Sequence, residues 1–367
     1  MAPQDVSGVC AVKTEVIEKD DQYILNHCTK YLARESRDAR HDFGQYAPGD
    51  GRAAICEAWR FPVVDAHWDG ASAAGSYPYN DVTFVYDGRR ASPSSVAVLG
   101  TFGPLHSPVP LRALMFAGEP TGFFATTVRV PKGQVHTYKF AVDGAYVLDP
   151  VNPQRTVLDN GEPWSRFFTD ACTVPLSLSR AERELLGRLV CHLLPFRLDE
   201  NRRLIRGVYE SLDRARRDEE FPLAYVLDDE VGTVNYIDKL IARQEQHHAD
   251  DYHTCLTIIG EIVRSRFGGL DPAAAPTDLY ADLYRQMETE KVDGWDYSRY
   301  GSPRFFLLLL RRHAITGAFA HPKHGGNSGA AGWMYLESRF RDARDATLFD
   351  WRRALEPPLG HSADYRG

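Results

Sequence analysis

The sequence predicts an α+β protein built of an irregular N-terminal region, an immunoglobulin-like β-sandwich and an all-α helical bundle. Its 367 residues, 43% hydrophobic and 25% charged, fit a globular chain long enough for two domains. Short runs rich in β-branched and aromatic residues alternate with turn residues between positions 81 and 170. After residue 175 the apolar residues recur at helical spacing instead.

The first part, residues 1–80, is polar, with turn signals at 48–51 and 70–75. We expect it to be irregular and assign it no function. Asp65 and His67, followed by Trp68, resemble a metal-ligand pair, but without further ligands an ordered surface turn is the better interpretation.

The second part, residues 81–172, is predicted to be the β-sandwich. Residues 126–130 and 138–142 alternate apolar and polar side chains, as half-buried strands do, and the bends are supplied by residues 131–133 and 143–144. The predicted strands are 82–86, 96–102, 123–130, 136–142 and 146–148.

The third part, residues 178–345, is predicted to be the helical bundle, followed by a C-terminal tail at 346–367. Ser179 and Glu182 have the spacing of a capping box, and the leucine-rich stripe that follows ends at Pro195. Further helices are expected at 229–244, 252–267, 277–290 and from Ser302 to Gly317.

Charge excludes several classes of partner. The net charge of -7 and pI near 6.0 provide no general attraction for nucleic acid or an anionic membrane. The arginines at 214–217 are interleaved with acids and predict a solvated helix face.

The strongest apolar run, residues 305–310, is far shorter than the roughly 20 residues of a membrane span. We therefore expect no membrane span.

The first residues of the chain and its cysteines bear on the compartment. Residues 1–21 mix acidic and basic residues where a signal peptide would be apolar, so we expect a cytoplasmic protein as encoded, or a periplasmic one by co-export with a partner. The six cysteines have no Cys-x-x-Cys spacing, and their pairing is left open.

The predicted sandwich resembles the glycogen-binding modules of the AMPK-β (CBM48-like) early-set class. The resemblance rests on residues 98–102, 130–133, 138–140, 142–144 and 149–152. In that family two exposed aromatic rings stack on glucose, and a lysine bonds to hydroxyl groups. The resemblance implies glycan contacts from Lys139 and Tyr146, with Trp164 as a further candidate. Gly103 to His106 occupy the place of the first tryptophan, so a structural or subunit-docking role is the favoured alternative.

The helical part resembles the gluconate 2-dehydrogenase subunit 3 family. The most specific stretch is residues 317–327 (GAFAHPKHGGN), followed by Gly332 and Trp333, with support from residues 232–238 (GTVNYID). The resemblance implies a non-catalytic accessory or chaperone subunit that forms a heterodimer with a large flavoprotein of the glucose-methanol-choline (GMC) type. That partner would hold FAD and oxidise a sugar, glycoside or alcohol. An alternative from another class is a carbohydrate-binding adaptor acting through the sandwich.

The residues themselves agree that this chain carries no redox cofactor. It has no Gly-x-Gly-x-x-Gly motif, no haem motif and no P-loop. We therefore expect no catalytic residue in this chain. A self-sufficient enzyme that uses the two loop histidines is the least favoured hypothesis.

The candidate site is a loop that contacts the partner or shapes its active-site mouth. Its residues are His321, Pro322, His324, Gly325, Gly326, Asn327 and Trp333. Glu245 and His248, with His247, Asp250, Asp251 and His253 nearby, form the most metal-like cluster. A di-iron bundle would need a second Glu-x-x-His motif, so we expect a solvated helix junction and no metal.

Overall fold

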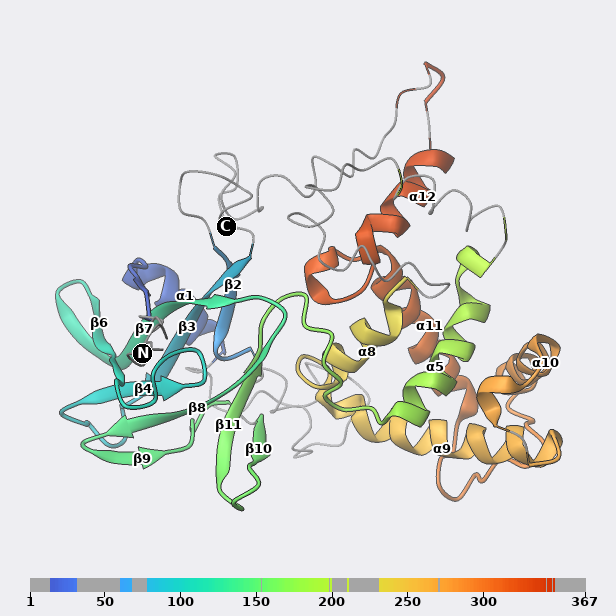
Figure 1. Ribbon diagram of the computed structural model, residues 1–367, viewed down its shortest axis with the longest axis horizontal. Helices are drawn as coiled ribbons and strands as arrows, with labels where there is room; N and C mark the ends of the chain where they lie inside the picture. The colour runs from blue at the N-terminus through green and yellow to red at the C-terminus, as the bar shows by residue number, and fades with distance from the viewer. Residues whose placement is uncertain are drawn as a thin grey trace, which may run out of the picture.

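A computed structural model describes residues 14–31, 60–67, 78–152, 154–197, 199, 210, 231–269, 271–340, 342–344 and 346. Antiparallel sheets come first in the chain and helices follow, which confirms the predicted α+β class (Figure 1). Trp68, the arginines at 214–217, the turn signals at 48–51 and 70–75, and tail residues 347–367 lie outside the described residues.

The first sheet has the order β1-β7-β3-β2, with β6 also paired to β7. Its strands are β1 (Val16–Ile17), β2 (Val63–Ala66), β3 (Tyr79–Asp87), β6 (Arg112–Phe116) and β7 (Glu119–Pro131). Strand β3 pairs over its whole length with residues 123–131 of β7 in antiparallel register, with Val82 opposite Val128. This long pair forms the centre of the sheet.

The second sheet has the order β10-β11-β8-β4-β5, with β9 also paired to β8. Its strands are β4 (Val96–Gly100), β5 (Val109–Pro110), β8 (Val135–Val142), β9 (Ala145–Val147), β10 (Arg155–Val157) and β11 (Pro163–Phe168). Phe84 of the first sheet lies 5.0 Å from Tyr138 and 5.5 Å from Phe167 of the second, measured between ring centroids. These fully or nearly fully buried rings join the two sheets into one core.

The prediction of an irregular region up to residue 80 is wrong for its described residues. Helix α1 (Asp21–Tyr31) buries Ile24, Leu25 and Cys28 against Phe61 and Leu114, and β1 and β2 extend the first sheet. Two- and four-residue strands are too short to show a period of two, so pairing partners far along the chain define them.

Asp65 and His67 belong to this added part of the sandwich, and the surface-turn prediction is also wrong. Asp65 lies in β2, where its carboxylate accepts a hydrogen bond from the hydroxyl of Tyr23 at 2.7 Å. The Nδ1 atom of His67 lies 2.7 Å from the carboxylate of Asp81. The two side chains therefore contact different groups of the sandwich.

The helical half contains α5 (Arg180–Leu193), α8 (Thr233–Ile241), α9 (Ala249–Arg266), α10 (Thr277–Glu288), α11 (Pro303–Phe319) and α12 (Ala331–Arg339). Short 3-10 turns lie at Pro195–Arg197, Gln246–His248, Pro272–Ala274, Pro322–His324 and Ser328–Ala330. The capping box of Ser179 and Glu182 is confirmed. Leu186, Ile237, Ile259 and Phe306, each from a different helix, are fully buried in the shared core.

Helix α11 does not end at Gly317 as predicted, since it continues to Phe319. A Cβ atom at Gly317 would lie 2.8 Å from the ring of Tyr236 and 3.1 Å from Thr233. The glycine therefore allows α8 and α11 to approach closely and does not mark a helix end. Among the described residues, no helix combines the length and apolarity needed to cross a bilayer.

Candidate functional site

The predicted loop, residues 321–327, is fastened to the rest of its own chain. The side chain of Asn327, fully buried, donates to the carbonyl of Ala320 at 2.8 Å and accepts from the backbone N–H of Gly332 at 2.7 Å. The carbonyl of Lys323 accepts from the N–H of Ala171, at the end of the sandwich, at 2.8 Å. The loop thus lies at the junction of the two halves.

Two glycines of the loop are required by conformation and space. Gly325 has φ +90°, and a Cβ there would lie 2.5 Å from the side-chain nitrogen of Asn235. At Gly326 a Cβ would lie 2.3 Å from the carbonyl oxygen of Gly317. The glycines therefore serve close packing of the loop against α8 and α11.

The two histidines of the loop form no acid–base pair. Their ring centroids are 6.5 Å apart at 78°, and His321 stands edge-on to Trp333 at 5.6 Å. The Nδ1 atom of His321 accepts the backbone N–H of Lys323 at 3.1 Å, and burial lowers the pKa of His321 to about 4. Trp333 in turn donates its indole N–H to the carbonyl of Phe319 at 2.7 Å. His321 and Trp333 thus hold the loop in shape, and His324 is its exposed imidazole.

Asp238, which the sequence did not point to, holds the linker between the two halves, residues 169–179 between β11 and α5, and we refer to this contact as the Asp238 clamp. Its fully buried carboxylate accepts the N–H groups of Leu176, Ser177 and Leu178 at 2.8–2.9 Å. Burial alone would raise the pKa of Asp238, but Lys239 and these three N–H groups hold it below its ordinary value. The GTVNYID stretch could have suggested a buried acid within α8, but not its distant partner.

Lys239 and Asn235 extend the clamp. The ammonium of Lys239 lies 3.0 Å from the carboxylate of Asp238 and donates to the carbonyl of Val174 at 2.5 Å. The amide of Asn235 donates to the carbonyls of Cys172 and Gly325, each at 3.0 Å. Linker, helix α8 and loop are therefore joined by one buried polar network.

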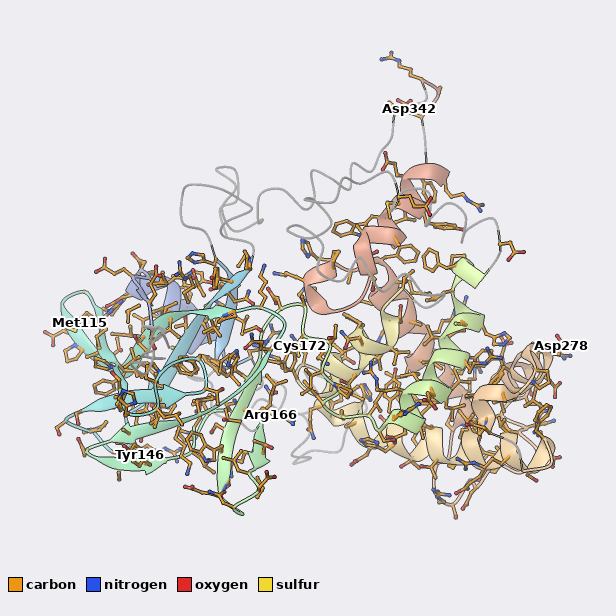
Figure 2. All side chains as sticks on the ribbon, in the orientation of Figure 1. Met115, Tyr146, Arg166, Cys172, Asp278 and Asp342 are labelled. Carbon is orange, nitrogen blue, oxygen red and sulfur yellow. The ribbon has the colours of Figure 1, made fainter. Side chains whose placement is uncertain are left out.

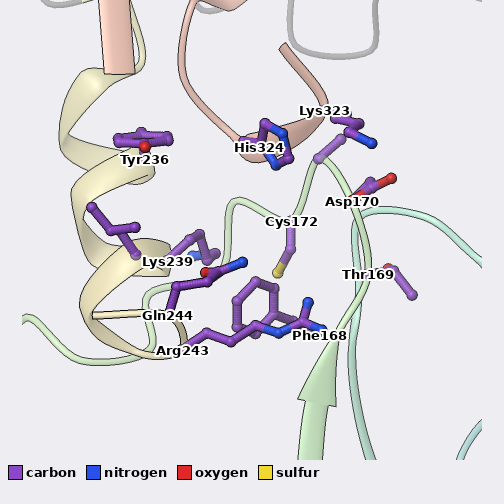
Figure 3. A pocket seen from close by; sticks show the side chains of 12 residues that line it. Phe168, Thr169, Asp170, Cys172, Tyr236, Lys239, Arg243, Gln244, Lys323 and His324 are labelled. Carbon is purple, nitrogen blue, oxygen red and sulfur yellow. The ribbon is translucent and has the colours of Figure 1, made fainter. Parts of the chain in front are cut away.

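A cavity of about 210 Å³ opens beside this network (Figure 3). Phe168, Asp170 and Cys172 line one side, and Tyr236, Lys239, Arg243 and Gln244 line the other, with Lys323 and His324 above. Arg243 also donates to the carbonyls of Arg60 and Pro62 at 3.1 and 3.0 Å. The cavity thus lies at the junction of the two halves, and most of its basic groups already bond to protein atoms.

The cluster around Glu245 is less solvated than the sequence predicted. His247 and His248 are 4% and 2% exposed. The Oε2 atom of Glu245 lies 2.8 Å from Nε2 of His313 and accepts from Arg312 at 2.6 Å. Burial would raise the pKa of Glu245, but these contacts hold it at about 2. The ring of His248 lies 6.0 Å from that of His313 on α11, and both histidines of the 3-10 turn at residues 246–248 are buried, which corrects the prediction of a solvated junction.

Of the other three residues of the predicted cluster, Asp251 contacts His248 at 2.6 Å, whereas His253 and Asp250 lie apart from it. His253 bonds through Nδ1 to Glu182 at 2.7 Å, and Asp250 is exposed. The helical spacing of α9 places these two side chains away from Glu245, although all three residues are close in sequence.

The three predicted glycan residues lie on the second sheet. Lys139 is 7% exposed, forms an ion pair with Glu162, and has its ammonium 5.0 Å from the ring centroid of Trp164. Tyr146, on β9, is 61% exposed (Figure 2). Lys139 is therefore engaged within the sandwich, and Tyr146 is the accessible aromatic ring of the three.

Helix α11 carries an exposed apolar stripe, and two of its residues belong to the apolar run at 305–310, which the sequence predicts to be a core helix segment. Phe305, Leu308 and Ile315 are 37%, 54% and 45% exposed. They stand three and seven residues apart, and therefore on one face of the helix, with Arg311 and Arg312 also exposed. We refer to Phe305, Leu308 and Ile315 as the α11 stripe. An apolar stripe of this kind is typical of an interaction surface.

Two solved structures to which this chain is similar are esterases, and both similarities are weak. The enterochelin esterase of Shigella flexneri is 16% identical with a TM-score of 0.22, and the alignment covers 27% of this chain and 32% of the esterase. The enterobactin esterase of the same organism, in the presence of 2,3-dihydroxy-N-benzoyl-glycine, is 11% identical with a TM-score of 0.21 over 70% of this chain and 92% of that one. The chain spans about a third of the length of the first esterase, and TM-scores this low support no inference.

The comparison with curated proteins gives no match. Residues 224–337 match the sequence model of the gluconate 2-dehydrogenase subunit 3 family. The matched segment contains the loop, the Asp238 clamp, the Glu245 cluster and the α11 stripe. This match supports a subunit of a dehydrogenase complex, and it confirms for residues 224–337 that the chain is similar to gluconate 2-dehydrogenase subunit 3.

Proposed function

We propose that this chain is a non-catalytic accessory subunit that stabilises an FAD-dependent dehydrogenase of the GMC type, which oxidises a sugar or alcohol. The α11 stripe carries the proposal. It lies within the segment similar to the dehydrogenase subunit family, and it offers apolar surface to a partner. Flavin and catalytic residues would come from the large subunit.

The buried hydrogen bonds at the junction of the two halves support an accessory role. Buried hydrogen bonds hold the loop, α8 and the linker together, and the loop histidines form no acid–base pair. A stable scaffold of this kind can present the α11 stripe and the exposed His324 to a partner without ordering them on binding. The loop would then shape the entrance to the partner's active site.

The experiment is co-expression with a flavoprotein dehydrogenase encoded beside this chain, followed by size-exclusion chromatography with absorbance read at the flavin band. We expect co-elution, and a loss of soluble flavoprotein when this chain is omitted. Leu308→Asp should abolish co-elution, because burying an unpaired carboxylate in an apolar interface is costly. Phe116→Asp is the matched control, since Phe116 is 59% exposed on the sandwich. Separate elution of the wild-type chain would contradict the proposal.

A carbohydrate-binding adaptor is the second candidate, and the exposure of Tyr146 favours it. An exposed ring can stack on the apolar face of a sugar, although Lys139 is engaged by Glu162. Glucan binding by the purified chain that is lost in Tyr146→Ala would support this function. Equal retention of both proteins on a glucan matrix would contradict it.

A further inference from the structure

A tight turn between α8 and α9 brings one carboxylate and two imidazoles together. The N–H of Glu245 donates to the carbonyl of Leu240 at 2.9 Å, and the N–H of His248 donates to the carbonyl of Glu245 at 2.9 Å. The turn places donor atoms of Glu245, His247 and His248 within 4.8 Å of one another. Both histidines are buried, and the side chain of Glu245 is 27% exposed, so solvent reaches the cluster at this carboxylate.

The spacing of the donor atoms fits a shared ion better than a direct bond. The Nε2 atom of His248 lies 3.8 Å from Oε2 of Glu245, which is too long for a hydrogen bond. Nitrogen and oxygen ligands lie about 2.1 Å from Zn²⁺, so two of them in a tetrahedral set are about 3.4 Å apart. Binding would therefore draw these atoms together by only about an ångström.

A carboxylate outside the set orients His248 for this purpose. The Nδ1 atom of His248 lies 2.6 Å from Oδ2 of Asp251, which favours the tautomer that carries its proton on Nδ1. The lone pair of Nε2 then faces Glu245. Carboxylate–histidine pairs of this kind commonly position imidazole ligands of metals.

Arg312 and His313 compete for the same carboxylate. Both contact Oε2 of Glu245, at 2.6 and 2.8 Å. The side chain of Arg312 is 57% exposed, so it can turn into solvent, whereas His313 is held by the hydroxyl of Tyr252 at 2.9 Å. A bound cation would replace the charge of Arg312 beside Glu245.

We propose that Glu245, His247 and His248 form a binding site for a divalent transition-metal ion, best matched by Zn²⁺, with a solvent molecule as fourth ligand. Two imidazoles and one carboxylate are a donor set that Zn²⁺ favours. The site is independent of the proposed accessory function. Its ion would hold the α8–α9 turn in shape beside Phe305 of the α11 stripe, whose ring centroid lies 6.3 Å from that of His248.

The test is metal binding by the purified, chelator-treated full chain. Titration calorimetry and elemental analysis should show one equivalent of Zn²⁺, and Co²⁺ should give the intense visible bands of a tetrahedral site. Glu245→Gln and His248→Gln should abolish stoichiometric binding. The matched control is His253→Gln, because His253 lies five residues further along and bonds to Glu182 instead.

Two variants outside the ligand set keep the test decisive if a ligand variant fails to fold. Asp251→Asn should weaken Zn²⁺ binding about 10- to 100-fold, since it removes the group that orients His248. Arg312→Ala should tighten binding, because it removes the competing cation. The proposal is overturned if neither the wild-type chain nor Arg312→Ala binds stoichiometric Zn²⁺. It is equally overturned if folded Glu245→Gln and His248→Gln bind Zn²⁺ as the wild type does.

Discussion

At Asp238 a single buried carboxylate accepts three backbone N–H groups of the linker and pairs with Lys239. Asp238→Ala leaves those three N–H donors without an acceptor and the buried ammonium without its carboxylate counter-charge. We expect a loss of about 3–5 kcal/mol in the free energy of unfolding, measured by chemical denaturation. Asp293→Ala, at an exposed position of the same half, should change it by less than about 0.5 kcal/mol. Equal stability of both variants would show that the clamp contributes little.

His136 makes the stability of the sandwich depend on pH. It stacks on Phe167 at 5.1 Å, and burial lowers its pKa to about 4 from the ordinary value of 6.5. Between these values the unfolded chain binds more protons, so this contribution is present above pH 6.5 and is lost as the pH falls toward 4. Wild-type stability should therefore fall by about 2 kcal/mol between pH 7 and pH 5 through this residue alone.

The measurement compares denaturation of His136→Gln and the wild type at both pH values. The fall in stability should be about 2 kcal/mol smaller in the variant. Burial raises the pKa of Asp149 to about 6, which gives a stabilisation that is lost as the pH rises through 6, and this opposite effect cancels because both proteins share it. His106→Gln, at an exposed residue of the sandwich, is the control. An unchanged pH dependence in His136→Gln would contradict the prediction.

The capping box at the start of α5 is a local sequence signal, and its contribution to stability can be measured. The hydroxyl of Ser179 accepts the N–H of Glu182 at 3.3 Å, and the carboxylate of Glu182 accepts the N–H of Ser179 at 2.7 Å. Ser179→Ala should destabilise the helical half by about 1 kcal/mol. Thermal unfolding measures the change, and Arg180→Ala is the control because its side chain is 92% exposed. A variant as stable as the control would mean that the helix is fixed by its core contacts alone.

Elements with a strong local sequence pattern could be predicted, and elements without one could not. Strong local patterns identified α5, α10 and the long strands β3 and β8, because their periodicity lies within one element. Strands β1, β5 and β10 have two or three residues each and depend on partners distant in sequence, so they were missed. The predicted helix end at Gly317 is wrong because close packing between helices leaves no local signal in the sequence.

In the candidate site, too, local features could be predicted from the sequence, whereas contacts between distant elements could not. The loop at residues 321–327 was found from its own sequence, whereas its contacts with Ala171 and Asn235 required the fold. Glu245 and His248 were recognised as neighbours, but burial under α11 depends on His313, which is 65 residues beyond His248. Residues that come together from distant elements give no local pattern.

At the scale of the whole molecule, Arg243 links the helical half to the start of β2 through the carbonyls of Arg60 and Pro62. Hydrogen bonds from a charged donor contribute about 1.5–3 kcal/mol, so Arg243→Met should let residues 60–67 open about 10- to 100-fold more often. Native-state hydrogen exchange read by mass spectrometry should show that acceleration in β2, with α10 unchanged. Arg243→Lys, which keeps the charge but has a single ammonium in place of the guanidinium fork, should restore part of the protection. If exchange in β2 is the same in all three proteins, the two halves are held together by the Asp238 clamp and the core contacts without Arg243.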